Sequence, residues 1–547
     1  MTTASHTIGP RDKPLLRQTI GDNLEDTVAR LPDAEALVVA HQGIRQTWSE
    51  LNETIDAVAK GLLALGVEVG DRVGMWSPNF AEWVYIQYAT AKVGAIQVNV
   101  NPAYRTSELE FALKHSGCRF LFTRTEYLTS AYRSMVEEVS PGLPALERVV
   151  YADTTDWADL LTSAADVTDD ALRERSAMLR HDDSINIQYT SGTTGSPKGA
   201  TLSHHNILNN AWFVADACGY TEHDRVCIPV PFYHCFGMVM GNLACSVTGA
   251  TMVIPSPTFD PGAVLQTIQE EQCTSLYGVP TMFIAELTHP DFARFDLSSL
   301  RTGIMAGSPC PSEVMRRVVD EMNMTQVTIA YGMTETSPVS TQTGLEDTLD
   351  HRVGTVGRVH PHVEIKIVDP ETDETVPRGT GGEFCTKGYS VMNGYWEDPE
   401  RTAWVVDDDG WMHTGDLATM DEDGYVNIVG RIKDMVIRGG ENIYPREIEE
   451  YLYCHPSVAD VQVIGVPDEK YGEELMAWVQ LTKGHKLTED DLKEYCRGRI
   501  AHFKVPRYVK FVTEFPMTVT GKVRKVEMRE KSIADLGLAV AADVETA

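Results

Sequence analysis

The feature that most limits the fold of this chain is a glycine-rich segment that follows a strand-like run at residues 185–189. The run, Ile-Asn-Ile-Gln-Tyr, alternates apolar and polar side chains, as expected of a strand with one buried face. Residues 190–199 then read Thr-Ser-Gly-Thr-Thr-Gly-Ser-Pro-Lys-Gly. Glycines let this backbone curl, while its hydroxyls, N–H groups and Lys198 can donate to anionic oxygens. The pattern predicts a polyphosphate-binding loop leaving a sheet.

The spacing of this loop differs from that of the Walker loop, which requires Gly-x-x-x-x-Gly-Lys-Ser/Thr. Pro197 also stands where a Walker loop would continue into its helix. A flexible Ser/Thr/Gly linker would share the composition, but linkers seldom end in Pro-Lys-Gly after a strand of buried character. We therefore expect a phosphate-binding loop of another class.

The chain as a whole is predicted to be an α/β protein with several domains, because 547 residues are too many to fold around a single hydrophobic core. Thr47 and Glu50 have the spacing of a capping box, and apolar residues at helical spacing follow. Strands are expected at 71–76, 95–99 and 119–123, with helices at 82–93 and 107–115. Such alternation is typical of parallel sheets.

The character of the sequence changes near residue 350, where short alternating segments lie between turn residues and predict a β subdomain at about 350–430. An α+β pattern follows it. The chain is expected to divide into a flexible polar arm (1–15), a large N-terminal domain of two α/β sheet subdomains plus the β subdomain (16–430), a hinge (431–434), a small mobile α+β C-terminal domain (435–532) and a frayed acidic tail (533–547).

Composition limits the class of partner. The formal net charge of −32 disfavours nucleic acid and anionic membranes. No stretch approaches the length of about 18 apolar residues that a membrane span needs, and the N-terminus lacks the apolar core of a signal peptide. The ten cysteines show neither Cys-x-x-Cys spacing nor a cluster with histidine, which predicts reduced core thiols in a cytoplasmic protein.

Four further motifs carry polar groups suited to a nucleotide. Thr334 and Glu335 follow a strand-like run, where a hydroxyl and a carboxylate suit phosphate and Mg²⁺. Asp416, directly after a glycine, could accept from both hydroxyls of a ribose. A charged joint at 430–434 and Lys522 on a Gly-containing loop complete the set. Each motif alone has an ordinary alternative, namely a satisfied turn or a solvated surface charge.

Taken together and in this order, the motifs resemble those of the adenylate-forming superfamily of acyl- and aryl-CoA synthetases, stand-alone adenylation domains and beetle luciferases. The resemblance covers residues 25–535 approximately and includes the major core motifs. Three stretches, Pro231–Gly237, Leu276–Phe283 and Ile437–Pro445, look most like medium-chain fatty acyl-CoA synthetases.

The resemblance implies how ATP is held. The loop residues that would wrap its β- and γ-phosphates are Thr190, Ser191, Gly192, Thr193, Thr194, Gly195, Ser196, Pro197 and Lys198. Ala306, Gly307 and Ser308 would flank its adenine, and Tyr331 would pack on it. Gly332 and Met333 are also expected among the ATP- or AMP-binding residues. Asp416 would bind the ribose hydroxyls, with Arg431 nearby.

The resemblance also implies how the reaction proceeds. Thr334 would touch the α-phosphate, Glu335 would hold Mg²⁺, and Lys522 would bridge the acid carboxylate and the α-phosphate. Like charges must be brought together, so the catalytic work is positioning and electrostatics. The C-terminal domain would rotate about Lys433, where many relatives carry Asp, withdrawing Lys522 and bringing Arg438, Gly439 and Gly440 to the CoA channel.

The acid pocket is implied in the same way. The residues that would form it are His234, which we also include among the catalytic residues, Phe236, Val279, Pro280, Met305 and Met333. The apolar members fit an ordinary core equally well. Pro231–Gly237 holds no aspartate, which amino-acid-activating relatives use to pair with the substrate ammonium. A buried ammonium without a partner is costly, so an apolar acid is favoured.

The sequence thus predicts an ATP- and Mg²⁺-dependent acyl-CoA ligase, monomeric or homodimeric, that activates a medium-chain fatty acid as acyl-AMP and transfers it to CoA. An aryl- or short-chain-acid ligase, or an acyl-AMP ligase that loads a carrier protein, stays open. An idle nucleotide-binding scaffold is disfavoured, because Lys198, Glu335, Asp416 and Lys522 are all retained.

Overall fold

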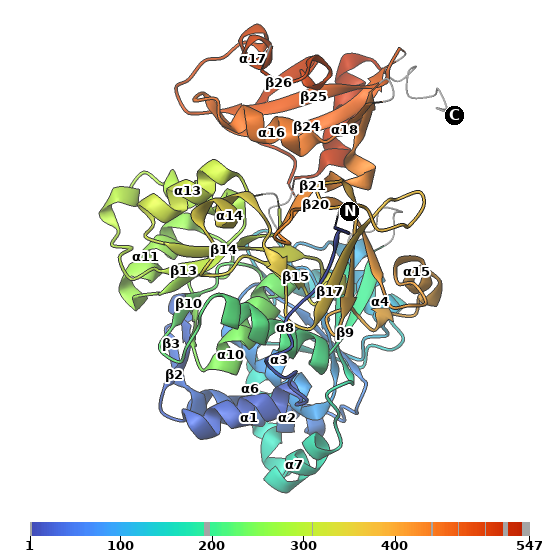
Figure 1. The fold of residues 1–547 in the computed structure, drawn as a ribbon. Coiled ribbons are helices and arrows are strands. Elements are labelled where there is room, and N and C mark those ends of the chain that lie inside the picture. The colour runs from blue at the N-terminus through green and yellow to red at the C-terminus, as the bar shows by residue number, and fades with distance from the viewer. Residues whose placement is uncertain are drawn as a thin grey trace.

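Figure 1 shows the fold in a computed structural model of the chain. The residues that it describes are 3–190, 197–308, 310–438, 441–468, 470–497, 499–517 and 523–538. Within these ranges the chain forms four β-sheets, with helices packed on them. Among the helices of this part of the chain, none combines the length and the apolar character needed to cross a bilayer.

The first large sheet has seven strands in the order β19-β9-β8-β5-β4-β6-β7. Its strands are β4 (Arg72–Trp76), β5 (Ile96–Asn99), β6 (Phe120–Thr123), β7 (Arg148–Tyr151), β8 (Ser184–Thr190), β9 (Lys198–Ser203) and β19 (Gly394–Tyr395). Strands β4 to β8 are parallel, as predicted, whereas β9 and β19 run antiparallel to their neighbours. The predicted capping box begins α2 (Trp48–Ala64), where Thr47 Oγ1 accepts from Glu50 N at 3.3 Å.

The second large sheet has nine strands in the order β16-β15-β14-β13-β12-β10-β11-β2-β3. These are β2 (Glu35–Val39), β3 (Ile44–Thr47), β10 (Arg225–Cys227), β11 (Thr251–Ile254), β12 (Ser275–Gly278), β13 (Thr302–Ala306), β14 (Gln326–Gly332), β15 (Val339–Gln342) and β16 (Arg358–Val359). One core cluster joins Leu37 of β2 and Val73 of β4 to residues of α2, α3 (Ala81–Val93) and α8 (His204–Ala217). The two sheets therefore share a hydrophobic core.

The predicted β subdomain is an antiparallel five-stranded sheet in the order β1-β17-β18-β20-β21. Its strands are β1 (His6–Ile8), β17 (Val363–Val368), β18 (Gly382–Gly388), β20 (Met412–Met420) and β21 (Val426–Arg431). The prediction that residues 1–15 form a flexible arm is wrong, because β1 pairs with β17 over three residues. This pairing covers an edge of the sheet that would otherwise expose unpaired backbone groups.

The C-terminal part forms a separate layer, drawn orange to red in Figure 1. Its sheet has the order β23-β22-β25-β24, with β26 on β25. The elements are β22 (Val436–Arg438), β23 (Glu441–Ile443), α16 (Pro445–Tyr453), β24 (Val458–Asp468), β25 (Gly472–Leu481), α17 (Glu489–Cys496), β26 (Tyr508–Val512) and α18 (Lys525–Leu536). Because α18 continues to Leu536, the tail predicted from residue 533 begins too early.

All ten cysteines are free thiols, and nine of them are buried; Cys454 is the exposed one. Burial raises the pKa of the Cys118 thiol to about 12, and the Cys218 thiol shifts likewise. A buried thiol with a raised pKa reacts slowly, because the thiolate is the nucleophile. We expect Ellman's reagent to label one thiol per native chain rapidly and all ten after unfolding. Cys454→Ser should abolish the rapid phase, and several rapid thiols would contradict the burial pattern.

Candidate active site

The glycine-rich segment begins and ends on two strands, β8 and β9, that pair antiparallel. Thr190, at the end of β8, is the direct partner of Lys198, at the start of β9. The strand predicted before the loop is therefore present, and a second strand rather than a helix follows it, unlike a Walker loop. Residues Ser191 to Ser196 lie outside the described residues.

Glu335 lies beside this strand pair, in the 3₁₀ turn Thr334–Thr336 that follows β14, and only 5% of its surface is exposed. Its Oε1 accepts from Thr190 Oγ1 at 3.3 Å and from the Tyr395 hydroxyl at 2.9 Å. Burial, reinforced by the Glu335 carboxylate, raises the pKa of Tyr395, so the phenol remains a donor. The arrangement brings a buried carboxylate and a loop hydroxyl together. Oxygen ligands of this kind can bind Mg²⁺ alongside the oxygens of a phosphate.

Lys198 adds positive charge to the same place. Its Nζ lies 5.0 Å from the centre of the Tyr395 ring. A cavity of about 240 Å³ is lined by Lys198, Tyr395 and Arg401, among others. Tyr395, on β19, therefore connects the carboxylate and the cation, although no sequence motif had indicated this residue.

Asp416 is held by two partners on neighbouring elements. Its Oδ2 accepts from the Tyr331 hydroxyl at 2.8 Å, and its Oδ1 accepts from Arg431 Nε at 3.1 Å. Arg431 is also its direct partner in the β20–β21 pair. Burial and the Asp416 carboxylate raise the pKa of Tyr331, which keeps its proton for this bond. The contacts fix the carboxylate in place, and the half-exposed guanidinium adds a positive charge beside it.

The residues expected around adenine come from the carboxyl ends of neighbouring parallel strands. Ala306 ends β13 opposite Ala330 of β14, so Gly307 and Ser308 leave the sheet beside Tyr331. Ligands of α/β proteins generally bind at such strand ends. Gly307 has a φ of +89°, and a side chain there would also approach Val279 Cγ1 at 3.2 Å. Glycine is therefore needed at this turn.

Some of the predicted acid-pocket residues lie together, but one does not. Phe236, Val279 and Met333 belong to the same core cluster, and Phe236 stacks on Tyr277 with ring centres 5.6 Å apart. Met305 is fully buried in the other cluster. Alternation along β13 turns its side chain away from the face of Ile304 and Ala306. Met305 is thus separated from the apolar cluster of Phe236 and Val279, and its place in the acid pocket stays a prediction.

The remaining two pocket residues have defined backbone roles. Pro280 is the first residue of α12 (Pro280–Leu287), where its fixed φ suits a helix start. His234 Nδ1 accepts from Phe236 N at 3.3 Å and so caps the turn that carries Phe236. His234 thus orients a candidate wall of the acid pocket.

The residues predicted for the hinge and the CoA channel are described in part. Lys433 lies in the 3₁₀ turn Ile432–Asp434 between β21 and β22. Its pKa is lowered, mainly by partial desolvation and to a smaller extent by repulsion from Arg431. Arg438 donates to both carboxylate oxygens of the buried Glu474, at 2.7 and 2.8 Å. Gly439, Gly440 and Lys522 lie outside the described residues.

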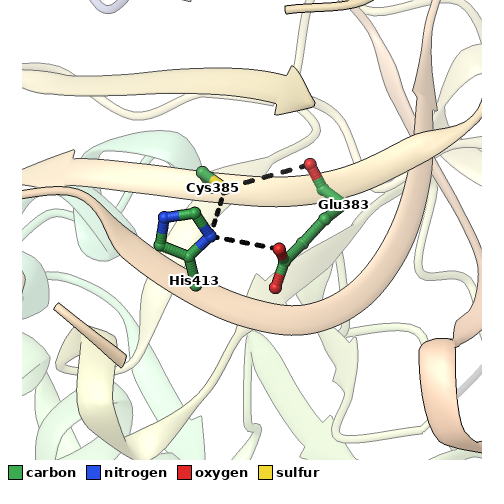
Figure 2. A group of neighbouring side chains, drawn as sticks. All are labelled: Glu383, Cys385 and His413. Atoms are coloured by element: carbon green, nitrogen blue, oxygen red, sulfur yellow. Dashed lines mark hydrogen bonds and ion pairs between the residues drawn. The ribbon is translucent and has the colours of Figure 1, made fainter. Parts of the chain in front are cut away.

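A cluster that the sequence did not indicate supports the turn before Asp416. Glu383 Oε1 accepts from Gly415 N at 2.9 Å, and Glu383 Oε2 lies 3.1 Å from His413 Nδ1 (Figure 2). Cys385 Sγ lies 3.5 Å from the same nitrogen, a contact between cysteine and histidine that the sequence motifs do not show. Strand pairing brings together residues 28 positions apart, which spacing along the chain cannot reveal.

Two family models match this chain. The model of the AMP-binding enzyme matches residues 24–396, and that of the AMP-binding enzyme C-terminal domain matches residues 447–522. The chain belongs to the AMP-binding enzyme family. The predicted membership of the adenylate-forming superfamily is thereby confirmed, as is the α/β and α+β multidomain fold.

Several proteins match this AMP-binding enzyme over nearly its full length. YngI of Bacillus subtilis is 51% identical, covering 95% of this chain and 98% of the relative. The mitochondrial medium-chain acyl-CoA ligase ACSF2 of Danio rerio is 46% identical, covering 98% and 92%. Among solved structures, the anthranilate CoA ligase AuaEII in complex with anthranoyl-AMP has a TM-score of 0.85 at 28% identity, covering 96% and 99%.

Proposed function

We propose that this protein is an AMP-forming acid–CoA ligase that activates a medium-chain fatty acid. The observation that carries the proposal is the convergence of Thr190, Lys198 and Glu335 at one sheet edge. The Tyr331–Asp416–Arg431 group lies at the end of the same β14 that leads into Glu335. Adenylation of a carboxylic acid needs a loop that binds the phosphates of ATP, a carboxylate that binds the metal ion and a carboxylate that binds the ribose.

In the first half-reaction, a carboxylate oxygen of the acid attacks the α-phosphorus of ATP, and the bond to the β-phosphate breaks to release pyrophosphate. The loop from Thr190 to Lys198 holds the leaving group, and Thr334 lies beside the α-phosphate. Mg²⁺, held at Glu335, would neutralise phosphate charge. Lys522 would pair with both the acid carboxylate and the α-phosphate, which offsets the repulsion between the reactants.

In the second half-reaction, the CoA thiolate attacks the acyl carbonyl and AMP leaves with the oxygen that came from the acid. We infer that the C-terminal domain turns about Lys433 between these steps, so that Arg438, Gly439 and Gly440 meet CoA. The ion pair between Arg438 and Glu474 supports this, since it fixes the end of β22 rigidly within the domain that would move.

The side chains near the carboxyl ends of β13 and β14 support the proposal that the substrate is an apolar acid. Phe236, Val279 and Met333 pack in one apolar cluster, and the stretch Pro231–Gly237 carries no carboxylate for an ammonium group. ACSF2 of Danio rerio is a medium-chain acyl-CoA ligase by name, whereas AuaEII is an anthranilate CoA ligase. The greater identity to ACSF2 favours the aliphatic acid over the aryl acid. Cytoplasmic location and the monomeric or homodimeric state stay predictions.

The function is tested with ATP, Mg²⁺, CoA and a panel of acids of graded chain length together with benzoate-like acids. We expect AMP and acyl-CoA to form in equal amounts, fastest with medium-chain acids. Fastest turnover of an aryl or short-chain acid would overturn the substrate class only. Formation of ADP, or no AMP with any acid, would overturn the ligase itself. Transfer to a carrier protein but not to CoA would favour the carrier-loading alternative.

Asp416→Asn should weaken ATP use without changing the chemistry of the bound substrates. Losing a charged hydrogen-bond acceptor costs about 1.5–3 kcal/mol, or about tenfold to a hundredfold in kcat/KM for ATP. We expect most of this loss in KM, because ribose contacts persist from ground state to transition state. Initial rates against ATP concentration measure it. Asp408→Asn, which removes an exposed carboxylate eight positions away, is the matched control.

A KM for ATP that is unchanged in Asp416→Asn would contradict the ribose role. A fall in kcat alone would contradict it as well, since it would assign the carboxylate to the chemical step.

A further inference from the structure

Three side chains of different ligand chemistry meet on one face of the β subdomain (Figure 2). Glu383 and Cys385 are two positions apart on β18, so strand alternation turns them to the same face. His413 on β20 is the direct cross-strand partner of Cys385, which places the imidazole on that face too. The carboxylate, thiol and imidazole atoms all lie within 4.8 Å of one another.

The distances fit the edges of a tetrahedral metal site. Zn²⁺ binds thiolate sulfur at about 2.3 Å, imidazole nitrogen at about 2.0–2.1 Å and carboxylate oxygen at about 2.0–2.2 Å. A tetrahedron with these bonds has nitrogen–sulfur edges of about 3.5 Å and nitrogen–oxygen edges of about 3.4 Å. His413 Nδ1 lies 3.5 Å from Cys385 Sγ and 3.1 Å from Glu383 Oε2. Two of the three ligand–ligand edges therefore match, while Cys385 Sγ and the Glu383 carboxylate, within 4.8 Å of each other, must approach to about 3.6 Å. Rotation of the two side chains can close this edge and leave the fourth position to water.

The surroundings support a bound cation. Asp407 Oδ2 lies 3.9 Å from His413 Nε2, the ring nitrogen that faces away from the cluster. A carboxylate on the far nitrogen is the usual companion of a metal-binding histidine. Lys366 is the cross-strand partner of Cys385 on the neighbouring strand β17. Its ammonium forms an ion pair with Asp373 at 3.8 Å, which offsets the positive charge near the cluster. Cys385 is fully buried, while a quarter of the His413 side chain is exposed and gives a path of entry.

We propose that Glu383, Cys385 and His413 form a binding site for a Zn²⁺-type divalent cation. Mixed sulfur, nitrogen and oxygen ligands favour Zn²⁺ over Mg²⁺, which takes oxygen ligands. Binding releases the thiol proton of Cys385 and the Nδ1 proton that His413 shares with Glu383, and the ring keeps one proton on Nε2, beside Asp407. This site is separate from the Mg²⁺ position inferred at Glu335.

The cation site is connected to the turn that carries Asp416. Glu383 Oε2 faces the cluster, whereas Oε1 of the same carboxylate holds the Gly415 N–H at 2.9 Å. Gly415 adopts a φ of +72°, and the β18–β20 pairing is irregular at this point. A cation that draws Glu383 toward Cys385 therefore pulls on the residue before Asp416. The effect on ATP rests on the proposed function, whereas the site itself does not.

Metal binding is tested on the full chain without substrates. Cd²⁺ serves as the probe, because its thiolate complex has a charge-transfer absorption, and Zn²⁺ is then measured by displacement. We expect one Cd²⁺ per chain with this absorption in the unaltered protein and in Cys454→Ser, the exposed-thiol control. Cys385→Ser should lose the absorption. His413→Gln should keep it with affinity at least about 100-fold weaker, because losing even an outer partner of a metal ligand costs about 10–100-fold.

Two results would overturn the site. One is the absence of a thiolate absorption in the unaltered protein, and the other is an unchanged affinity in both Cys385→Ser and His413→Gln. Circular dichroism of each variant separates lost binding from lost folding, and His413→Gln keeps the test valid if Cys385→Ser fails to fold.

The connection to Asp416 is tested by KM for ATP at one equivalent of Zn²⁺ in Mg²⁺ buffer. We expect KM to rise at least threefold in the unaltered protein and in Cys454→Ser, but not in Cys385→Ser. An equal KM with and without Zn²⁺ in a protein that binds the ion would overturn the connection. Failure of every acid in the substrate panel would instead count against the proposed function, since cation binding needs no substrate.

Discussion

Lys522→Ala is expected to form acyl-AMP about 10²–10³-fold more slowly, as for the loss of one charged group that stabilises a transition state. The side chain would neutralise a carboxylate as it approaches the α-phosphate, and water replaces it poorly. The second half-reaction should remain near its normal rate, because Lys522 would be withdrawn from the site during that step. Pyrophosphate release in a single turnover measures the first step, and thioester formation from synthetic acyl-AMP measures the second.

The matched control is Lys531→Ala, which removes an exposed lysine of α18 that lies near the Trp478 ring. It should leave both half-reactions unchanged. Equal loss of both steps in Lys522→Ala would contradict the account in which one domain serves two half-reactions in two positions.

Glu335→Gln is expected to slow acyl-AMP formation by about 10²–10³ and to raise the Mg²⁺ concentration needed for half-maximal rate. The amide keeps the shape of the side chain and can still accept from Thr190 and Tyr395, so the fold around β14 should persist. It lacks the negative charge that Mg²⁺ requires, and a metal that stabilises phosphate charge is worth several kcal/mol, about tenfold in rate per 1.4 kcal/mol.

Pyrophosphate release against Mg²⁺ concentration, at saturating ATP, provides the measurement. Glu400→Gln is the control, since Glu400 is an exposed carboxylate on the helix after Tyr395. A Glu335→Gln protein with a normal Mg²⁺ requirement would show that Glu335 is not the metal-binding group.

The sequence predicted those parts of the fold that local patterns determine. The capping box at Thr47, the strand before the loop and the helix expected at 82–93 each depend on residues that are close in sequence, and each is present. β1 was missed because three residues are too few to show alternation, and its partner β17 lies more than 350 positions away. Long-range pairing of this kind leaves no local signal.

The same distinction explains the candidate site. Loop residues that bind phosphates must adjoin in sequence, so glycines, hydroxyls and a lysine form a recognisable motif. Tyr395 donates to Glu335 from 60 positions away, and Glu383 supports Gly415 from another strand, so neither follows a motif. The place of Met305 could not be predicted either, because apolar character alone does not tell which face of β13 a side chain occupies.

The central claim, attack of the acid on the α-phosphorus of ATP followed by transfer to CoA, is tested most directly with an acid whose carboxylate carries the heavy isotope of oxygen. One carboxylate oxygen should remain on the phosphate of AMP when the thiolate displaces it. We predict one labelled oxygen in AMP for each acyl-CoA formed, measured by mass spectrometry. Unlabelled AMP, or label in inorganic phosphate together with ADP, would contradict the acyl-adenylate mechanism.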